Sequence, residues 1–493
     1  MERNSIITKL INTAQITNMN SIEASSLKTL VEISNTDKSS SEVLNSNQKK
    51  TNSPLNIFVI CTSLFLLIGA TFLAFYLQSE YEQFRIERMS TFWGLSFLIF
   101  ATSLFAFKVS FFIYMLFRYF KYEAIKSVSD EKLPIVTVIV PAYNESKQVY
   151  DTLLSLANSD FPREKLQLIS IDDGSKDDTW KWMLIAKKEM GDALEIYQQT
   201  KNMGKRHALY RGFNLGTGDV YVTVDSDSIV KPDTLRKLVS PFITDKNCGA
   251  VAGNIRVLNN KKAMLPRMLD VSFVLSFEFV RSAESTLKSV LCTPGALAAY
   301  SSTAVHKCLP EWINQTFMGK ASDIGEDRAM TNMILKQGKH VLFQRNAVAF
   351  TNVPEKYRGL YKMFIRWGRS NVRENIQMAK YVFTDFRLGA KTGARLLFLS
   401  QAFKLIMSYP FILFMLFFVL THPILFIGST LVSILVLSTF SVIFYSNRYE
   451  IKEALWAYSY SILYTFGLFW ITPYAIATAS RRGWLTRDLA EKK

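Results

Sequence analysis

The chain has 493 residues, 49% of them hydrophobic, and a formal net charge of +17. This hydrophobic fraction is high for a wholly soluble protein, and the positive charge fits anionic lipid headgroups or a nucleotide ligand. The sequence has no zinc-finger spacing or RNP-type motif, which argues against nucleic acid, and its four cysteines show no paired spacing, which favours a reducing, cytosol-facing compartment.

The first part of the chain contains two apolar stretches of bilayer length. Residues 1–54 are rich in Ser, Asn and Thr, and we expect a mostly disordered cytosolic tail. Residues 57–77 and 92–117 are each long and apolar enough to cross a bilayer, within a membrane segment predicted over 55–120. The basic residues that flank this pair place both flanks in the cytoplasm: Lys49, Lys50, Arg118, Lys121 and Lys126.

A soluble α/β domain is predicted over residues 121–355. Short apolar runs typical of buried strands alternate there with helical patterns. The strands are expected at 135–140, 166–171 and 220–224, and the clearest helices at 152–157 and 179–188. Such alternation predicts a largely parallel sheet covered on both faces.

Residues 356–396 combine aromatic and basic side chains. Tyr361 and Phe364 are interleaved with Lys362, Arg369 and Arg373. Basic amphipathic helices of this kind tend to lie in the membrane interface. The alternative is a solvated basic face on a soluble helix, but direct continuation into apolar sequence favours the interface.

The C-terminal part is predicted to contain a membrane hairpin over residues 397–446. Its two spans, 397–420 and 423–445, are joined by only two residues, so the chain returns to its starting side. Residues 454–478 are long enough to cross as well, but Gly467 and Pro473 interrupt them. We expect 447–493 to be an interfacial or re-entrant segment that does not cross.

Two carboxylates follow the strand predicted at 220–224. Asp225 and Asp227 are separated by one residue where this strand ends, so both can reach one divalent cation, Mg²⁺ or Mn²⁺. A cation held by so few carboxylates has coordination positions left for phosphate oxygens. Ligands of open α/β sheets bind outside the carboxyl ends of the strands. The alternative for an isolated Asp-x-Asp is a solvated acidic turn.

Two other strand ends also carry polar residues. Tyr143 and Glu145 follow the strand at 135–140, where Tyr143 can stack on a nucleotide base; an ordinary strand-to-helix turn is the alternative. Asp172 and Asp173 end the next strand, where they and the residues after them can also cap a helix.

Two motifs farther along place charge at predicted helix starts. Lys205 and Arg206 follow Gly204, which permits close approach, and they supply positive charge for a diphosphate. Asp327 lies in the sequence Gly-Glu-Asp-Arg, where it can act as a general base or simply belong to an acidic helix start paired with Arg328.

The order of these motifs resembles the membrane-embedded, processive branch of family 2 glycosyltransferases, which includes hyaluronan, chitin and cellulose synthases. The resemblance is strongest to hyaluronan synthases and implies a GT-A type domain inserted between transmembrane helices. It implies inverting transfer from a UDP-sugar, with Asp327 as the base and Asp225 and Asp227 as metal ligands. It also implies nucleotide contacts from Tyr143, Glu145, Asp172, Asp173, Lys205 and Arg206.

The same resemblance assigns residues to the acceptor and to a gate. Arg281 and Gly295 match segments that line the acceptor site, and Cys292 matches a small wall residue there. Arg366 and Trp367 match the Arg-Trp of a Gln-x-x-Arg-Trp motif, although Met363 replaces the Gln. Trp484, Thr486 and Arg487 match a Trp-Gly-Thr-Arg gating segment, although Leu485 replaces the Gly.

These features predict a multi-pass plasma-membrane enzyme with a cytosolic catalytic domain. It would polymerise a β-linked polysaccharide from a UDP-sugar and export it through its own spans. The alternatives are an enzyme that adds one sugar to a lipid carrier and an inactive assembly subunit. No motif distinguishes a hexosamine donor from a glucuronate donor.

Overall fold

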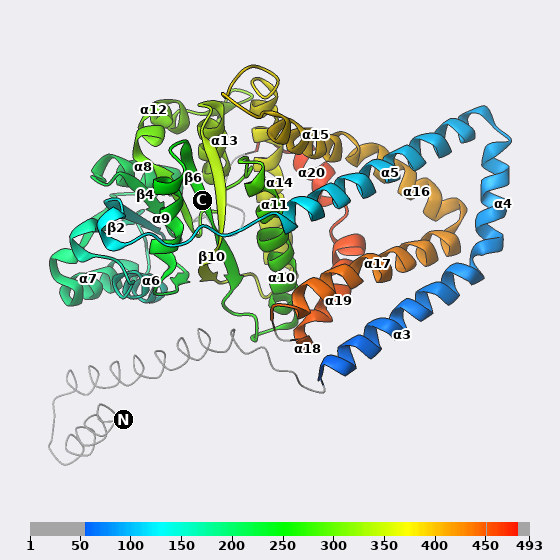
Figure 1. Cartoon of the computed structure of the whole chain (residues 1–493), viewed down its shortest axis with the longest axis horizontal. Helices are drawn as coiled ribbons and strands as arrows, with labels where there is room; N and C mark the ends of the chain where they lie inside the picture. Colours follow the sequence, from blue (N-terminus) through cyan, green and yellow to red (C-terminus); the bar gives the residue numbers. More distant parts are fainter. Residues whose placement is uncertain (1–54, 450, 482–493) are drawn as a thin grey trace, which may run out of the picture. The chain divides into compact units, whose positions relative to one another are not determined.

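The computed structural model describes residues 55–449 and 451–481, and an eight-stranded sheet lies at the centre of its α/β part (Figure 1). The strand order is β3-β2-β1-β4-β7-β6-β10-β5. The bounds are β1 (Val136–Ala142), β2 (Leu166–Asp172), β3 (Leu194–Gln198), β4 (Val220–Thr223), β5 (Ser228–Val230), β6 (Cys248–Val257), β7 (Ala298–Ser301) and β10 (His340–Thr351). The three strands predicted from apolar runs are therefore present as β1, β2 and β4.

The sheet is mixed rather than largely parallel. Strands β3, β2, β1 and β4 run parallel, as do β6 and β10, but β7 is antiparallel to both β4 and β6. The chain leaves β6 through a helical excursion and enters β7 at the same end of the sheet, which reverses the direction of β7. β5 is also antiparallel to its neighbour β10.

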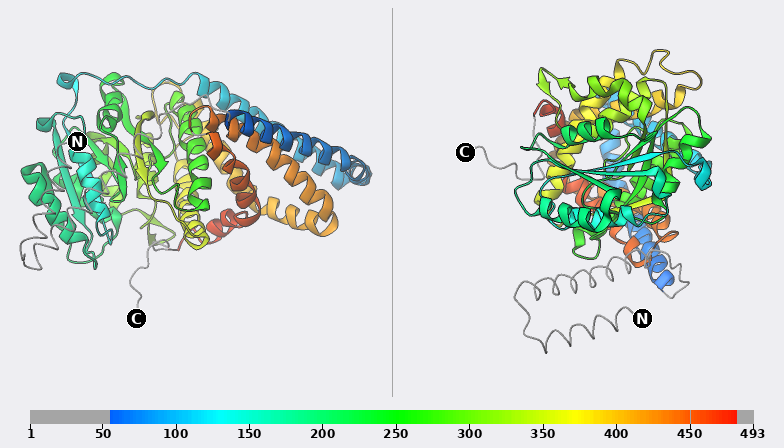
Figure 2. Two further views of the ribbon diagram at one scale, coloured as in Figure 1. Left: turned by 90° about the horizontal axis from the view of Figure 1, so that it is seen from below. Right: turned by 90° about the vertical axis from the view of Figure 1, so that its left-hand side faces the viewer.

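Helices cover both faces of this sheet (Figure 2, right). Their bounds are α6 (Gln148–Ala157), α7 (Thr179–Met190), α8 (Lys205–Leu215), α9 (Thr234–Thr244), α10 (Met264–Phe273), the π-helical turn η4 (Val274–Val280), α11 (Arg281–Thr286), α12 (Ser302–Ile313) and α13 (Glu326–Lys336). Short 3₁₀ turns lie at η1 (Asp130–Lys132), η2 (Arg163–Lys165) and η3 (Gly191–Ala193), and β8 (Thr316–Phe317) pairs with β9 (Lys320–Ala321). The helices predicted at 152–157 and 179–188 lie within α6 and α7.

Helix α8 is held tightly against the sheet. Ala208 packs in a buried cluster with Ile169 and Ile171 of β2. A Cβ added at Gly212 would come within 2.4 Å of the Ile139 side chain on β1, so only glycine permits this approach. The first residue of α8, Lys205, is thereby fixed close to the end of β4.

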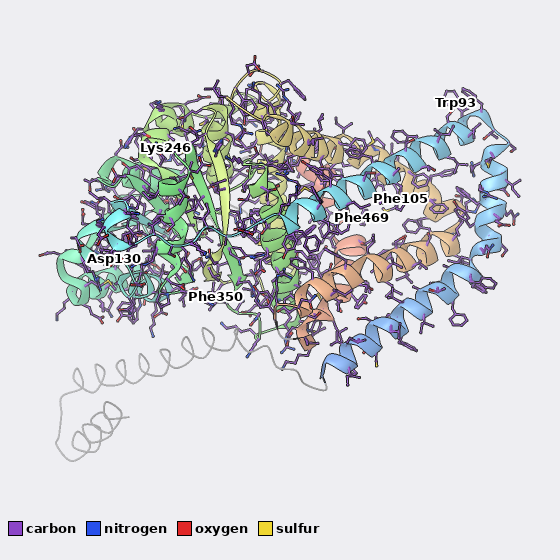
Figure 3. The ribbon with its side chains drawn as sticks, viewed as in Figure 1. Trp93, Phe105, Asp130, Lys246, Phe350 and Phe469 are labelled. Carbon is purple, nitrogen blue, oxygen red and sulfur yellow. The ribbon has the colours of Figure 1, made fainter. Side chains whose placement is uncertain are left out.

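Long apolar helices precede and follow the α/β part. Helices α3 (Leu55–Tyr76), α5 (Phe92–Phe120) and α17 (Pro423–Ser446) are each long and apolar enough to cross a membrane. Trp93 and Phe105 of α5, both labelled in Figure 3, are 81% and 67% exposed, as for a lipid-facing helix. The connection between the first two spans is itself a helix, α4 (Gln78–Met89), rather than a loop.

The span predicted over 397–420 is broken. Helices α15 (Thr392–Ile406) and α16 (Ser408–Thr421) meet at a bend of 44°. Pro410 explains the bend, because its ring lacks an N–H and clashes with the carbonyl of the residue four positions earlier. Counted as one span, the pair would make a fourth apolar crossing in the described part of the chain.

The last described segment is a series of short helices. These are α18 (Ile451–Ala454), α19 (Trp456–Ile462), the π-helical turn η5 (Leu463–Gly467) and α20 (Ile471–Ala477). Helix α14 (Tyr357–Ala379) packs against α13, α15 and α20. Two arginines of the predicted interfacial face, Arg369 and Arg373, are therefore buried in protein rather than turned to lipid headgroups. The predicted tail over 1–54 lies outside the described residues, as do Trp484, Thr486 and Arg487.

Candidate active site

A lysine and two carboxylates meet where β4 ends. The Lys205 ammonium forms an ion pair with Asp225 Oδ1 and lies 3.2 Å from Glu326 Oε1. Burial alone would lower the pKa of Lys205, but the two carboxylates outweigh burial and raise it above its ordinary value. The lysine is therefore a fixed positive charge at this edge of the sheet.

Asp227 lies in the same loop as Asp225. Its Oδ1 accepts a hydrogen bond from the Thr351 hydroxyl at 3.2 Å, which ties the loop to the end of β10. Between the two aspartates, the buried Ser226 donates to the Glu145 carboxylate at 3.2 Å. These contacts position the two carboxylates predicted to bind a metal, and both are partly accessible.

Asp327 lies beside this cluster at the start of α13. Its Oδ2 accepts from the Gly295 backbone N–H at 3.2 Å, and its Oδ1 accepts from the Arg328 N–H at 2.7 Å. Burial, followed by the neighbouring Glu326 carboxylate, raises the pKa of Asp327, while Lys205 opposes the shift. A carboxyl group with a raised pKa is suited to accept a proton near neutral pH.

A small pocket opens beside these two acidic residues. It is lined by Leu209, Phe213, Thr223, Gly295, Tyr300, Trp312, Glu326, Asp327 and Met330. Its apolar and aromatic walls come from α8, β4, β7, α12 and α13, and its carboxylates come from the N-terminus of α13. Elements that are distant in sequence thus converge at the end of β4.

The second predicted pair of carboxylates, Asp172 and Asp173, is buried at the end of β2. Asp173 accepts from the backbone N–H groups of Met203 and Gly204 at 2.9 and 2.8 Å. Burial raises the pKa of Asp173 to about 6, although these N–H groups oppose the shift. Asp172 accepts instead from the Ser175 N–H at 3.0 Å and from the Gln198 amide at 2.9 Å. Asp173 therefore organises the turn that leads into α8, and Asp172 links the turn after β2 to the end of β3.

Tyr143 and Glu145 have different surroundings at the end of β1. Tyr143 is partly exposed, as a base-stacking residue must be. The Glu145 carboxylate is buried and accepts the hydrogen bond from Ser226, so it supports the loop that carries Asp225 and Asp227.

Arg206 does not join Lys205 at the carboxylates. Its side chain is buried, donates to the Trp312 carbonyl at 2.6 Å and to the Gln315 amide oxygen at 3.1 Å, and lies over the Trp312 ring. Successive residues of a helix point about 100° apart, which explains why only Lys205 faces Asp225. The predicted contribution of Arg206 to diphosphate binding is not supported by this placement.

The predicted acceptor residues cluster around Asp327. Arg281 donates to the Cys292 carbonyl at 3.2 Å and lies 3.8 Å from the centre of the Phe277 ring. The Cys292 thiol is 4.0 Å from Asp327 Oδ2, and burial raises its pKa to about 12, so it remains protonated as a wall residue would. Gly295 lies between, where an added Cβ would come within 2.6 Å of Lys205 Nζ.

Trp367 and Arg366 lie on α14. The Trp367 ring is 42% exposed and packs against Phe273 and Phe364, which leaves part of its surface accessible to a ligand. Burial favours a raised pKa for both Glu326 and Asp327, and the positive charge of Arg366 opposes this effect at each carboxylate. Met363, which stands in place of the family's Gln, is buried.

Glu326 is the site residue to which no role was assigned from the sequence. Its carboxylate pairs with the Lys205 ammonium, which also pairs with Asp225. The positive charges of Arg366 and Arg206 act on it as well. Burial alone would raise the pKa of Glu326, but the Lys205 ammonium holds it below its usual range. Its position directly before Asp327 in the sequence could have indicated that Glu326 belongs to the site.

Comparison with known proteins identifies relatives over this region and beyond it. A model of the "Glycosyltransferase like family 2" matches residues 134–370. An N-acetylglucosaminyltransferase of Rhizobium leguminosarum bv. viciae is 30% identical over 378 residues, covering 73% of this chain and 84% of that protein. A hyaluronan synthase of Streptococcus pyogenes is 30% identical over 256 residues, covering 51% of this chain and 60% of that protein.

The matches differ in extent. The chain spans 58 to 60% of the length of the first curated relatives that it matches. Among solved structures, a mannosyltransferase from Pyrobaculum calidifontis in complex with GDP-Man and Mn²⁺ is 20% identical. It has a TM-score of 0.48 and covers 76% of this chain and 96% of that one.

The mixed α/β sheet, with its polar cluster where the parallel strands end, is the GT-A-like fold of a glycosyltransferase. The chain aligns with most of the Rhizobium leguminosarum protein, and the family 2 model matches its α/β part. The chain therefore belongs to glycosyltransferase family 2.

Proposed function

We propose that this chain is a membrane-embedded, inverting glycosyltransferase that uses a UDP-linked N-acetylhexosamine and builds and exports a β-linked polysaccharide. The observation that carries the proposal is the grouping of Lys205, Asp225, Glu326 and Asp327 at one end of the sheet. The names of the relatives support the choice of sugar, because several are N-acetylglucosaminyltransferases.

Asp327 is the proposed base. Its carboxylate takes the proton from the acceptor hydroxyl while that oxygen attacks the anomeric carbon of the donor, and the bond from that carbon to UDP breaks. Attack on the face opposite the leaving group inverts the α-linkage of the donor to a β-linkage. The Gly295 N–H holds Asp327 at 3.2 Å and so keeps the base oriented.

Lys205 faces the leaving group in this mechanism. A UDP that departs carries negative charge, and a buried ammonium of raised pKa stabilises that charge without having to reorient. Asp173 contributes indirectly, because it holds the Met203 and Gly204 backbone directly before Lys205.

A divalent cation fits the residues present. Asp225 and Asp227 supply hard oxygen ligands in one loop, and within the described ranges no group of three or more acidic, His or Cys residues forms a closed site. A cation held by these two carboxylates would neutralise charge on the diphosphate.

The proposed cofactor is tested with metal chelation and one matched variant. EDTA is expected to silence donor turnover, and added Mg²⁺ or Mn²⁺ to restore it. Asp225→Asn should lose turnover even with excess metal while remaining folded. Full turnover in EDTA would remove the cation from the mechanism.

The proposed reaction is tested with purified full-length protein and a panel of UDP-sugars. UDP-N-acetylglucosamine is expected to be consumed, with a product that grows beyond one sugar. Release of a single-sugar lipid would favour the lipid-carrier enzyme instead. No turnover of any donor, in a protein that is folded, would favour an inactive assembly subunit.

A further inference from the structure

One arginine of α14 joins two segments that are far apart in the sequence. Arg373 is 2% exposed, and its guanidinium uses all three nitrogens. Nε donates to the Ala479 carbonyl at 2.6 Å, Nη2 donates to the Arg481 carbonyl at 2.7 Å, and Nη1 donates to the Ser322 hydroxyl at 3.1 Å.

The first of these segments directly follows α20. Arg369, one helical turn before Arg373, donates to the Thr478 hydroxyl at 3.0 Å. Two arginines of α14 thus bind the residues that directly follow α20, one through a hydroxyl and the other through two backbone carbonyls. The hydrogen bonds of Arg369 and Arg373 together hold residues 478–481 against α14.

The second segment leads to the proposed base. Ser322 is buried and lies five residues before Asp327. Between them, Gly325 has φ of +79°, and a Cβ added there would come within 1.9 Å of Ser370 Oγ on α14. The same face of α14 therefore contacts both the approach to the base and the C-terminal segment.

From this geometry we propose that Arg373 is a positioning residue that locks the C-terminal segment beyond α20 to the loop that carries the base. Arginine is required because its planar fork reaches three acceptors at once, whereas the single nitrogen of lysine cannot span them. The contact itself is independent of the proposed function, and only its effect on transfer rests on that function.

The contact is tested without any activity measurement. Arg481 is exposed, and trypsin cuts after it, at the carbonyl that Arg373 holds. In full-length protein in detergent, Arg373→Lys should speed this cut about tenfold. The matched control is Arg387→Lys, because Arg387 is also buried and also binds backbone carbonyls, those of Lys288 and Ala390. Equal cutting rates in wild type and Arg373→Lys would overturn the proposal.

The coupling to transfer is tested with a double-mutant cycle. Arg373→Lys should lower kcat/KM for the UDP-sugar about tenfold, and it should have little further effect in a Trp484→Ala background. If Arg373 had only a structural role, the losses in kcat/KM from Arg373→Lys and Trp484→Ala would be additive, because the effects of independent sites add. Additive losses would therefore overturn the positioning role.

Ser322→Ala tests the hydrogen bond from Arg373 to the loop that carries the base, in case Arg373→Lys does not fold. It removes one hydroxyl and leaves both carbonyl contacts, so the cut after Arg481 should remain slow while kcat falls about threefold. An unchanged kcat would overturn the connection to the base loop. If wild type turns over no donor, the proposed function fails, but the cutting rates still decide whether Arg373 holds the segment.

Discussion

Glu326 and Asp327 are adjacent carboxylates with opposite electrostatic surroundings. Glu326 faces the Lys205 ammonium at 3.2 Å, which lowers its pKa against the effect of burial. Asp327 is buried beside Glu326, and its pKa is raised. Two neighbouring groups whose pKa values move apart can divide their roles, one remaining ionised and the other exchanging a proton.

This contrast predicts different behaviour for two amide variants. Asp327→Asn should bind UDP but lose transfer by about 10²-fold or more, as for other lost general bases. Glu326→Gln should retain transfer. Because it removes a negative charge from beside Asp327, it should also move the acidic limb of the kcat/KM profile to lower pH. Isothermal titration with UDP and pH-dependent turnover measure both effects, and a dead Glu326→Gln with an active Asp327→Asn would reverse the assignment.

Gly295 makes a second prediction at the scale of one residue. In Gly295→Ala, the new methyl would come within 2.6 Å of Lys205 Nζ and 3.6 Å of Asp225 Oδ1, so the flexible lysine must move away from Asp225. We expect turnover to fall about tenfold with little change in melting temperature. Gly69→Ala is the control, because a Cβ there meets nothing within 4 Å. A turnover equal to wild type would show that Lys205 need not hold this position.

At the scale of elements, the start of α13 depends on how closely α14 approaches it. The left-handed conformation of Gly325 directs the chain into Glu326 and Asp327, and Ser370 fills the space that a side chain would need. Glycine is therefore required twice, once for its backbone conformation and once for its lack of a Cβ.

This packing predicts partial rescue in a pair of variants. Gly325→Ala should abolish most transfer and lower the melting temperature, because its Cβ overlaps Ser370. Adding Ser370→Gly should recover part of the melting temperature, since the overlap disappears, while the left-handed backbone still costs about 1–2 kcal/mol. Thermal unfolding in detergent measures the recovery, and a double variant no more stable than Gly325→Ala would contradict this account.

At the scale of the whole molecule, the apolar helices and the α/β part are connected through buried polar contacts. Tyr445, near the end of α17, donates to Asp270 at 2.8 Å, and Asp270 also accepts two hydrogen bonds from Arg256 of β6 at 3.0 and 2.8 Å. An apolar helix is thus linked through α10 to the centre of the sheet.

The proposed topology predicts where the end of the chain lies. The sequence-based expectation that residues 447–493 do not cross the membrane puts residue 493 on the cytosolic side, and each of the helices described over 451–481 is shorter than 18 residues. In a cysteine-free variant, Lys493→Cys should resist an impermeant thiol reagent added to intact cells. Thr421→Cys, at the end of α16, should be labelled from outside. Labelling at position 493 would show that the segment crosses.

The sequence by itself determined the features that depend on local pattern. Apolar runs predicted β1, β2, β4 and the long helices, because strand burial and bilayer length are read from consecutive residues. The carboxylates at strand ends were likewise predicted from position, and the structure places one of them, Asp225, in an ion pair with Lys205.

Only the tertiary structure decided the features that depend on distant partners. The direction of β7 follows from the end of the sheet at which the chain returns. The separate places of Lys205 and Arg206 follow from the packing of α8, which directs Lys205 to Asp225 after β4 and Arg206 to Trp312 of α12. The sequence predicts Arg373 as an interfacial cation, but it is buried. Residues 322, 479 and 481, which accept hydrogen bonds from its guanidinium, come together only when the chain has folded.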